Sequence, residues 1–173
     1  MSVTIHTSLG DLKVELFCEE APRSCKNFLA LAASGTYDGT SFHRLIPDFM
    51  VQGGDPTGSG KGGLNYQRSL QSSELNDKLK HDRRGILGFV SDIKRPTDAP
   101  EIELEQGIGS QFYITFSRQP HLNGQYTVFG RVIDGLDTLA SIERVPVGKK
   151  NRPEIQISII TMTIHANPIA ESF

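Results

Sequence analysis

Short runs of alternating apolar and polar residues, separated by glycine and other turn residues, are the feature that most constrains how this chain can fold. Residues 3–7 and 12–16 both alternate in this way, and Gly10-Asp11 between them marks a turn. Alternation on both sides of a turn predicts a β-hairpin. We expect further short strands at residues 41–46, 49–52, 86–90, 111–116 and 126–133.

Two short helices are expected among these strands. Pro22 suits a first helical turn, Gly35 suits the position after a last turn, and the apolar residues between them share one face. A second helix is expected within residues 134–145. Most intervals between strands are too short for the crossover helices of a parallel sheet. With 17 glycines, the pattern is typical of a mainly β protein, a barrel or sandwich with helical plugs.

The last expected strand, residues 154–166, changes phase midway. Ile155, Ile157 and Ile159 follow one alternation, whereas Ile160 and the apolar residues after it follow the other. This change predicts either a β-bulge or a strand that is buried on both faces.

Length and composition favour a single soluble domain over residues 1–173. The net charge of −2 gives no reason to expect a nucleic acid or a membrane as partner. The N-terminal residues lack the charged and apolar regions of a signal peptide, so we expect none. Cys18 and Cys25 fit neither a disulfide framework nor a zinc site and are interpreted as small residues of the fold. We therefore expect a reducing compartment, the cytoplasm or the nucleus.

The glycine-rich segment GGDPTGSGKGG, residues 53–63, superficially resembles a phosphate-binding loop. A P-loop ending at Gly60-Lys61 would have Asp55 at its first glycine position and Gly62 at its hydroxyl position. A carboxylate inside a phosphate cradle is electrostatically wrong. The dinucleotide pattern also fails, because no clear helix follows the loop. We interpret these glycines as backbone positions with positive φ that border a shallow groove.

Other common catalytic patterns are missing from the sequence. No two of the five histidines have metal-binding spacing, and neither H-E-x-x-H nor G-x-S-x-G occurs. We therefore expect no metal and no cofactor, and hydrolysis has little support.

The segments FHRLIPDFMVQGGD (42–55), GSQF (109–112) and VFGRVIDGL (128–136) carry the clearest functional information. They resemble the cyclophilin family of peptidyl-prolyl cis–trans isomerases, and the similarity extends over almost the whole chain. IHANP near the end is similar to the small single-domain, spliceosome-associated type 3 group. The resemblance implies a closed eight-stranded antiparallel β-barrel capped by two helices, with proline-containing peptides as substrates and spliceosomal proteins as possible partners.

The resemblance also implies roles for individual residues. Arg44 is similar to the catalytic arginine, and Gln52 to the partner of the substrate carbonyl. The implied substrate-binding residues are His43, Phe49, Met50, Gly60, Gln111, Phe112, Tyr113, His121, Leu122 and Tyr126. An apolar pocket would hold the proline ring while a hydrogen bond from Arg44 favours the twisted amide.

The chain departs from the family pattern at three single positions and in one segment. His121 stands where the family commonly has tryptophan, so we expect weak cyclosporin binding. Tyr126 replaces a common histidine, and Tyr113 replaces a phenylalanine. The segment 91–109 is longer than usual and holds five acidic residues. As an atypical loop it could favour basic peptides, obstruct the groove, or simply be solvated.

Two functions remain open from the sequence. The first is an active isomerase of X-Pro bonds that assists protein folding or remodelling, which the pairing of Arg44 with Gln52 favours. The alternative is a weakly active or inactive proline-peptide binding module that acts as a scaffold in a ribonucleoprotein assembly, which His121 and the altered 91–109 segment favour.

Overall fold

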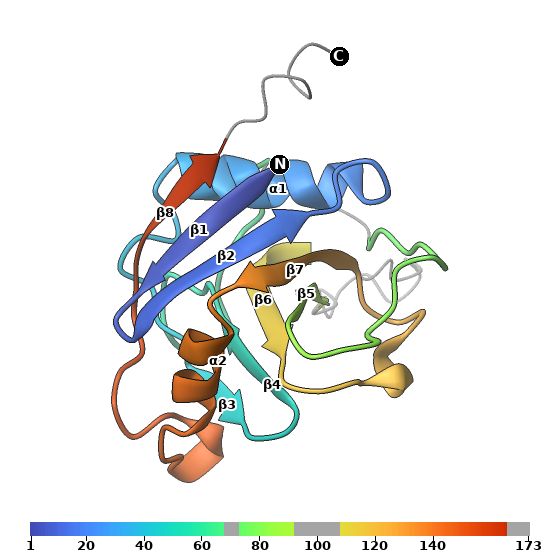
Figure 1. Cartoon of the computed structure of the whole chain (residues 1–173). Coiled ribbons are helices and arrows are strands. Elements are labelled where there is room, and N and C mark those ends of the chain that lie inside the picture. Colours follow the sequence, from blue (N-terminus) through green and yellow to red (C-terminus); the bar gives the residue numbers. More distant parts are fainter. Residues whose placement is uncertain (68–72, 92–107, 166–173) are drawn as a thin grey trace, which may run out of the picture.

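The computed structural model describes residues 1–67, 73–91 and 108–165 of the chain. The described part is mainly β, as expected, and the strands surround an apolar core (Figure 1). Its elements, in chain order, are β1 (Ser2–Thr7), β2 (Gly10–Leu16), α1 (Pro22–Ala33), β3 (Arg44–Ile46), β4 (Met50–Gly53), β5 (Ile86–Ser91), β6 (Ile108–Thr115), the 3₁₀ turn η1 (Pro120–Leu122), β7 (Val128–Asp134), α2 (Leu136–Glu143), the 3₁₀ turn η2 (Lys149–Asn151) and β8 (Ile159–His165). None of the described helices is long and apolar enough to cross a membrane.

The eight strands form one antiparallel sheet in the order β3-β4-β6-β5-β7-β2-β1-β8. The sheet curves into an open half-barrel, so the expectation of a closed barrel is wrong: the edge strands β3 and β8 do not pair. Short contacts outside the strands connect the two edges instead. Ser41 forms an isolated bridge with Ser158, and the Phe42 N–H donates to the Ile157 carbonyl at 2.9 Å. These bonds satisfy backbone groups near the edges without completing the ladder.

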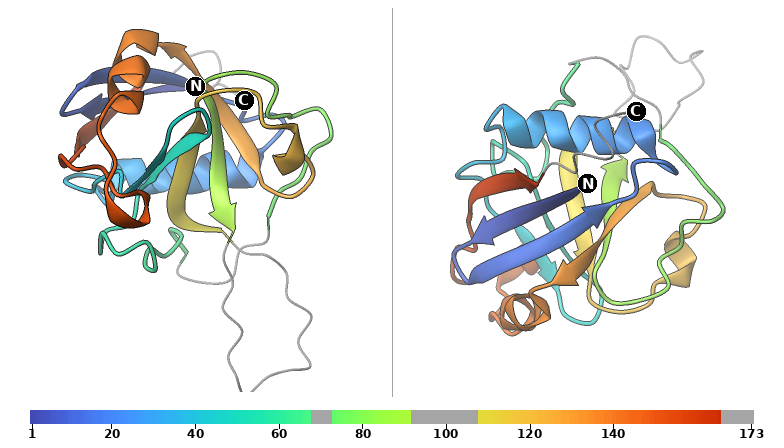
Figure 2. Two further views of the ribbon diagram at one scale, coloured as in Figure 1. Left: turned by 90° about the horizontal axis from the view of Figure 1, so that it is seen from below. Right: turned by 45° about the horizontal axis from the view of Figure 1, so that its top comes forward.

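The two helices lie at different ends of the half-barrel (Figures 1 and 2). α1 packs against β6, β7 and β8, and α2 packs against β2. As predicted, α1 begins at Pro22, and Gly35 follows its end with a φ of +77°. Phe28 of α1 is fully buried and its ring contacts Tyr37, Phe89, Phe112 and Phe129. This aromatic cluster anchors the helix on the sheet.

The first hairpin and the last strand follow the sequence pattern closely. Val3 pairs with Val14 across β1 and β2, and both are fully buried. Along β8, Thr7 of β1 pairs with Ile159 but His6 pairs with Thr161, which leaves Ile160 outside the register. Ile160 is 59% exposed. The phase change is therefore a β-bulge, the first of the two predicted alternatives.

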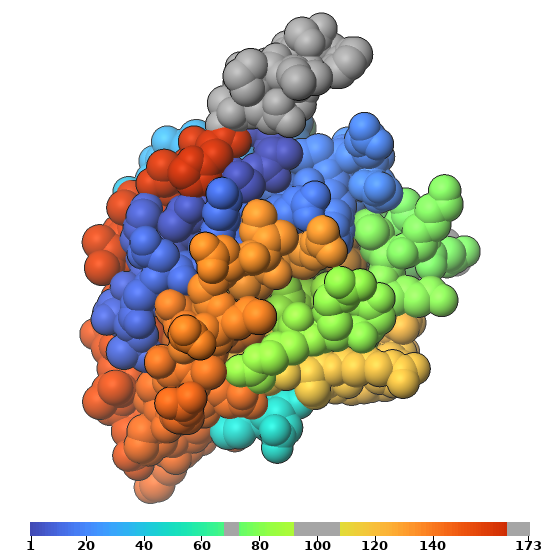
Figure 3. All heavy atoms as spheres, in the orientation of Figure 1, coloured from blue at the N-terminus to red at the C-terminus, as the bar shows by residue number. Residues whose placement is uncertain are grey.

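In the space-filling view, residues 73–85 (green) lie along the yellow segment that follows β6 (Figure 3). A backbone bond from the Gln119 N–H to the His81 carbonyl, 2.9 Å long, joins the two segments. The acidic loop expected at about 91–109 lies almost entirely outside the described residues, because only Ser91 and residues 108–109 are described.

Candidate active site

Arg44, Gln52 and Tyr113 lie side by side on three neighbouring strands. Arg44 of β3 pairs with Gln52 of β4, and Gln52 pairs with Tyr113 of β6. Directly paired residues of antiparallel strands project on the same face of a sheet. The alternation that buries Leu45 and Val51 in the core therefore brings Arg44, Gln52 and Tyr113 together outside it.

A chain of side-chain amides orients Gln52. The Arg44 Nη1 donates to Gln52 Oε1 at 3.4 Å, and Gln52 Nε2 donates to Gln111 Oε1 at 2.9 Å. Gln111 Nε2 in turn donates to the Gly62 carbonyl oxygen at 2.8 Å. Because a carbonyl oxygen can only accept, Gln111 must turn its Nε2 toward Gly62 and its Oε1 toward Gln52. Gln52 must then turn its Nε2 toward Gln111. The Gln52 oxygen is thereby held toward Arg44.

The glycine-rich loop that supplies Gly62 folds around the carboxylate of Asp55. This fully buried carboxylate accepts from the backbone N–H groups of Thr57 (2.9 Å), Gly60 (2.7 Å) and Gly62 (3.1 Å) and from the Thr57 hydroxyl (2.8 Å). Gly60 has a φ of +85°, which an L side chain rarely adopts. The amides that a phosphate would need are therefore already used by Asp55, consistent with the rejection of a P-loop.

Hydrogen bonding keeps Asp55 ionised in this cradle. Burial alone would raise the pKa of the carboxyl, but the bonds from Thr57, Gly62 and Gly60 outweigh burial and hold the pKa below its ordinary value of 3.8. The carboxylate thus acts as a fixed anion around which the loop bordering Gln111 is ordered.

A small apolar pocket opens beside Arg44 and Gln52. Its volume is about 100 Å³, well below the roughly 300–1,000 Å³ of pockets for drug-sized ligands. Such a space suits one small ring rather than a nucleotide. The pocket is lined by Arg44, Phe49, Met50, Gln52, Val90, Tyr113, Leu122 and Tyr126. Met50, Tyr113 and Leu122 form a buried cluster separate from the main core.

The Tyr113 hydroxyl is held by a buried histidine. Tyr113 Oη lies 2.6 Å from His81 Nε2, and His81 Nδ1 lies 2.9 Å from Asn123 Oδ1. The backbone N–H of His81 also donates to that oxygen at 2.7 Å, which identifies it as the acceptor. His81 Nδ1 must then carry a proton, so Nε2 accepts from the Tyr113 hydroxyl. Burial lowers the pKa of His81, which favours this neutral form.

A glycine makes room for this tyrosine. Gly88 of β5 pairs with Tyr113, and a Cβ atom built at Gly88 would overlap the Tyr113 hydroxyl. The absent side chain therefore allows the phenol to reach across β5 to His81.

The remaining predicted site residues lie around the pocket rather than in its lining. His43 is buried, and Gly60 lies close to its ring, so that a Cβ at Gly60 would be 3.3 Å from it. Gln111 contributes through Gln52, and the Phe112 side chain faces the main core. The exposed His121 packs against Phe49 with 5.7 Å between ring centroids.

Sequence reasoning missed His81, Asn123, Gly88 and the anchoring role of Asp55. Their partners are 25 to 42 residues away or lie within an irregular loop, so no periodic pattern marks them. The strand period of β6 did carry a usable signal, because Gln111 and Tyr113 face the site whereas Phe112 lies in the main core. Within residues 1–67, 73–91 and 108–165, no group of three or more His, Cys, Asp and Glu side chains is placed to hold a metal ion.

The half-barrel and this site together define a protein class: a β-sheet domain with a guanidinium and a carboxamide at the rim of a ring-sized apolar pocket. The model of the family described as cyclophilin type peptidyl-prolyl cis-trans isomerase/CLD matches residues 2–164. The chain therefore belongs to the cyclophilin-type peptidyl-prolyl cis–trans isomerase family.

Known relatives agree along nearly the whole chain. It is 50% identical to peptidyl-prolyl cis-trans isomerase CYP18-1 of Arabidopsis thaliana, over 98% of this chain and 99% of the relative. It is 48% identical to the human peptidyl-prolyl cis-trans isomerase-like 3, over 99% of this chain and 100% of the relative. A crystal structure of a Cryptosporidium parvum cyclophilin in the presence of the dipeptide Ala-Pro superposes with a TM-score of 0.87 at 47% identity, covering 96% of this chain and all of that one.

Proposed function

We propose that this protein catalyses cis–trans rotation of X-Pro peptide bonds, with Arg44 and Gln52 as the catalytic residues. The observation that carries the proposal is their pairing across β3 and β4 at the rim of the ring-sized pocket. Support also comes from the family match and from the relative that was crystallised in the presence of Ala-Pro.

The chemistry requires no covalent step. The barrier to rotation, roughly 18–20 kcal/mol, comes from resonance between the amide nitrogen and its carbonyl. A donor aimed at the prolyl nitrogen stabilises the twisted amide selectively, because the nitrogen lone pair is available only when resonance is broken. The barrier therefore falls without any proton transfer or cofactor.

Arg44 has donors to spare for this task. A guanidinium carries five N–H groups, and among the residues that the structure describes its side chain makes one hydrogen bond, the 3.4 Å bond to Gln52. Arg44 is exposed at the pocket rim. The proline ring would enter the pocket of Phe49, Met50, Tyr113 and Leu122, which places the prolyl nitrogen near the guanidinium.

Gln52 would bind the carbonyl side of the substrate. Its Nε2 carries two N–H groups, one of which bonds Gln111. The second has no partner among the residues that the structure describes and can donate to a substrate carbonyl. Gln111 and the Asp55-centred loop then act by positioning Gln52, and His43 lies against that loop at Gly60.

Weak cyclosporin binding is part of the same proposal. His121 covers Phe49 in the place of the family's common tryptophan, and imidazole offers a smaller contact surface than indole. Spliceosomal partners and a location in the cytoplasm or nucleus remain predictions from the sequence resemblance.

Two-dimensional NMR exchange on a short X-Pro peptide tests the function directly. Uncatalysed exchange takes tens to hundreds of seconds, so catalysis by the wild-type protein is readily visible. If the peptide binds, as judged by chemical-shift changes at the pocket, but exchanges at its solution rate, the protein is a proline-peptide binding module instead. That result would favour the scaffold role in a ribonucleoprotein assembly.

A further inference from the structure

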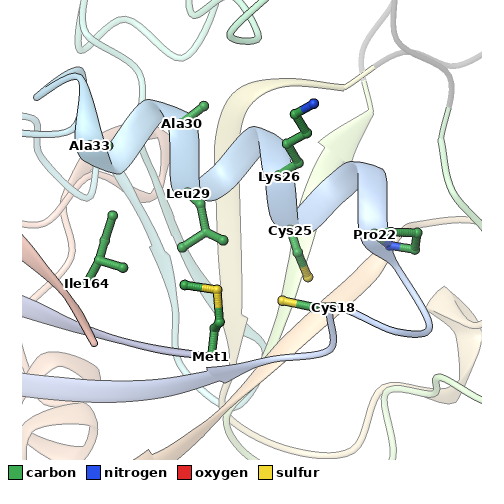
Figure 4. A pocket seen from close by; sticks show the side chains of 9 residues that line it. All are labelled: Met1, Cys18, Pro22, Cys25, Lys26, Leu29, Ala30, Ala33 and Ile164. Atoms are coloured by element: carbon green, nitrogen blue, oxygen red, sulfur yellow. The ribbon is translucent and has the colours of Figure 1, made fainter. Parts of the chain in front are cut away.

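The two cysteines of the chain meet at a second pocket, remote from Arg44. This apolar pocket has a volume of about 390 Å³ and shares no lining residue with the pocket beside Arg44. Cys18 approaches it from the loop after β2, and Cys25 from the first turns of α1 (Figure 4). In this view the two sulfur atoms point toward each other, and both cysteines are free thiols.

One carbonyl group fixes the two cysteines relative to each other. The Phe129 oxygen accepts from the Phe17 N–H at 2.8 Å, and Cys25 Sγ lies 3.4 Å from the same oxygen. The loop carrying Cys18 and the helix carrying Cys25 are thereby tied to a single point of β7. Two further bonds, from Ala21 N–H to the Phe17 oxygen and from Cys25 N–H to the Ala21 oxygen, hold the connecting chain. The fold thus holds together the two backbone segments that carry the facing sulfur atoms.

The two thiols differ in exposure and in acidity. Cys25 is 1% exposed, whereas Cys18 is only partly buried. A hydrogen bond from Cys25 lowers the pKa of Cys18 to about 7, with help from the N-terminal ammonium group and against the effects of burial and of Glu20. The same hydrogen bond, together with burial, raises the pKa of Cys25. Cys18 is therefore the more acidic of the two thiols and is partly ionised at neutral pH, and the thiolate is the reactive form.

We propose that Cys18 and Cys25 form an oxidant-sensitive dithiol site, in which Cys18 reacts with a peroxide and Cys25 resolves the product to an intramolecular disulfide. The Cys18 thiolate attacks one peroxide oxygen, the O–O bond breaks, and hydroxide leaves, which produces a sulfenic acid. The hydroxide released in this first step takes the proton of the Cys25 thiol as the Cys25 sulfur attacks the Cys18 sulfur, and the S–O bond breaks. That proton and hydroxide form water and the S–O bond releases a second hydroxide, so the peroxide is reduced by two electrons and the two thiols are oxidised to one disulfide.

The pocket gives this site its access route. Its lining is almost entirely apolar and is formed by Met1, Pro22, Leu29, Ala30, Ala33 and Ile164 with the aliphatic part of Lys26 beside the cysteines. A small neutral oxidant such as hydrogen peroxide can enter such a space without losing charge solvation. The proposal is independent of isomerase activity, because it involves none of the residues beside Arg44.

Intact-mass and peptide mass spectrometry on the native protein tests the site. The protein is treated with a small excess of hydrogen peroxide, free thiols are blocked by alkylation, and the chain is cleaved with trypsin. Cleavage after Arg23 separates the two cysteines, so their peptides stay joined only through a disulfide. We expect the wild-type mass to fall by two hydrogen atoms, the two peptides to be joined, and a thiol reductant to reverse both changes.

Two serine variants separate the roles of the cysteines. In Cys25→Ser we expect Cys18 to gain one oxygen atom and to be trapped by dimedone, the reagent for sulfenic acids. In Cys18→Ser we expect Cys25 to remain an unmodified thiol under the same treatment. Wild-type protein that gains oxygen without forming the bridge, or that forms only disulfide-linked dimers, would overturn the proposal. Equally fast oxidation of Cys25 in Cys18→Ser would do the same. The wild-type peptide map decides the question even if a variant does not fold.

Discussion

Replacing Asp55 with asparagine should destabilise the protein by about 2–4 kcal/mol. An amide offers one acceptor oxygen where the carboxylate offers two, so either the Thr57 N–H or the Gly60 and Gly62 N–H groups lose their acceptor. An unpaired buried donor costs about 1–3 kcal/mol, and the loss of charge on the remaining bonds removes about 1 kcal/mol more. The sum is a large part of the stability of an ordinary domain.

Urea unfolding of wild type, Asp55→Asn and the exposed control Asp77→Asn measures this effect. Because the pKa of Asp55 is lowered in the folded state, its stabilisation is complete above its ordinary value of 3.8 and disappears as pH falls through the folded-state pKa. The difference between wild type and Asp55→Asn should therefore shrink in acid, while Asp77→Asn follows wild type throughout. A wild-type-like Asp55→Asn at pH 7, or a difference that does not change in acid, would refute the account of the loop.

Three further substitutions test the pocket. Tyr113→Phe leaves His81 Nε2 without its donor and should lower the free energy of unfolding in urea by about 1–3 kcal/mol. Peptide binding should be kept, because the ring remains. Lost binding with unchanged stability would contradict this. In Gly88→Ala the added methyl group should overlap the Tyr113 hydroxyl and destabilise the protein by about 1–3 kcal/mol. The control Gly148→Ala, with only ordinary contacts, should be nearly neutral. Equal stabilities of the two variants would be evidence against the close packing at Gly88. His121→Trp should raise cyclosporin affinity in calorimetric titration, since it restores an indole donor and surface; an unchanged affinity would remove His121 as the cause.

Local patterns in the sequence predicted much of the fold. The alternation of the first hairpin and the proline and glycine at the ends of α1 reflect interactions between near neighbours in the chain. The phase change along β8 is visible in its local alternation, although the bulge itself forms against the distant strand β1. The site motif was equally visible, because Arg44 and Gln52 lie eight residues apart in one tight hairpin. Short-range geometry of this kind is largely determined by residue type and spacing.

Long-range geometry was not predictable in the same way. The open edge between β3 and β8 depends on how far the sheet curves, and the replacement bonds come from loop residues such as Ser41 and Ser158. His81 contacts Tyr113 and Asn123, which lie 32 and 42 residues further along the chain, and only the folded sheet brings the three together. Nothing in the residues around His81 marks it as the hydrogen-bond partner of a tyrosine in the pocket.

The most direct test of the central claim compares wild type, Arg44→Ala and the exposed control Arg83→Ala in X-Pro exchange measured by two-dimensional NMR. If Arg44 stabilises the twisted amide, Arg44→Ala should lose about 2.7–4 kcal/mol of transition-state stabilisation, a fall in rate of roughly 10²–10³ as for one preorganised donor. Peptide binding should change little, and Arg83→Ala, whose side chain pairs only with the adjacent Asp82 in the described part of the chain, should match wild type. Arg44→Ala that retains the wild-type exchange rate would contradict the account.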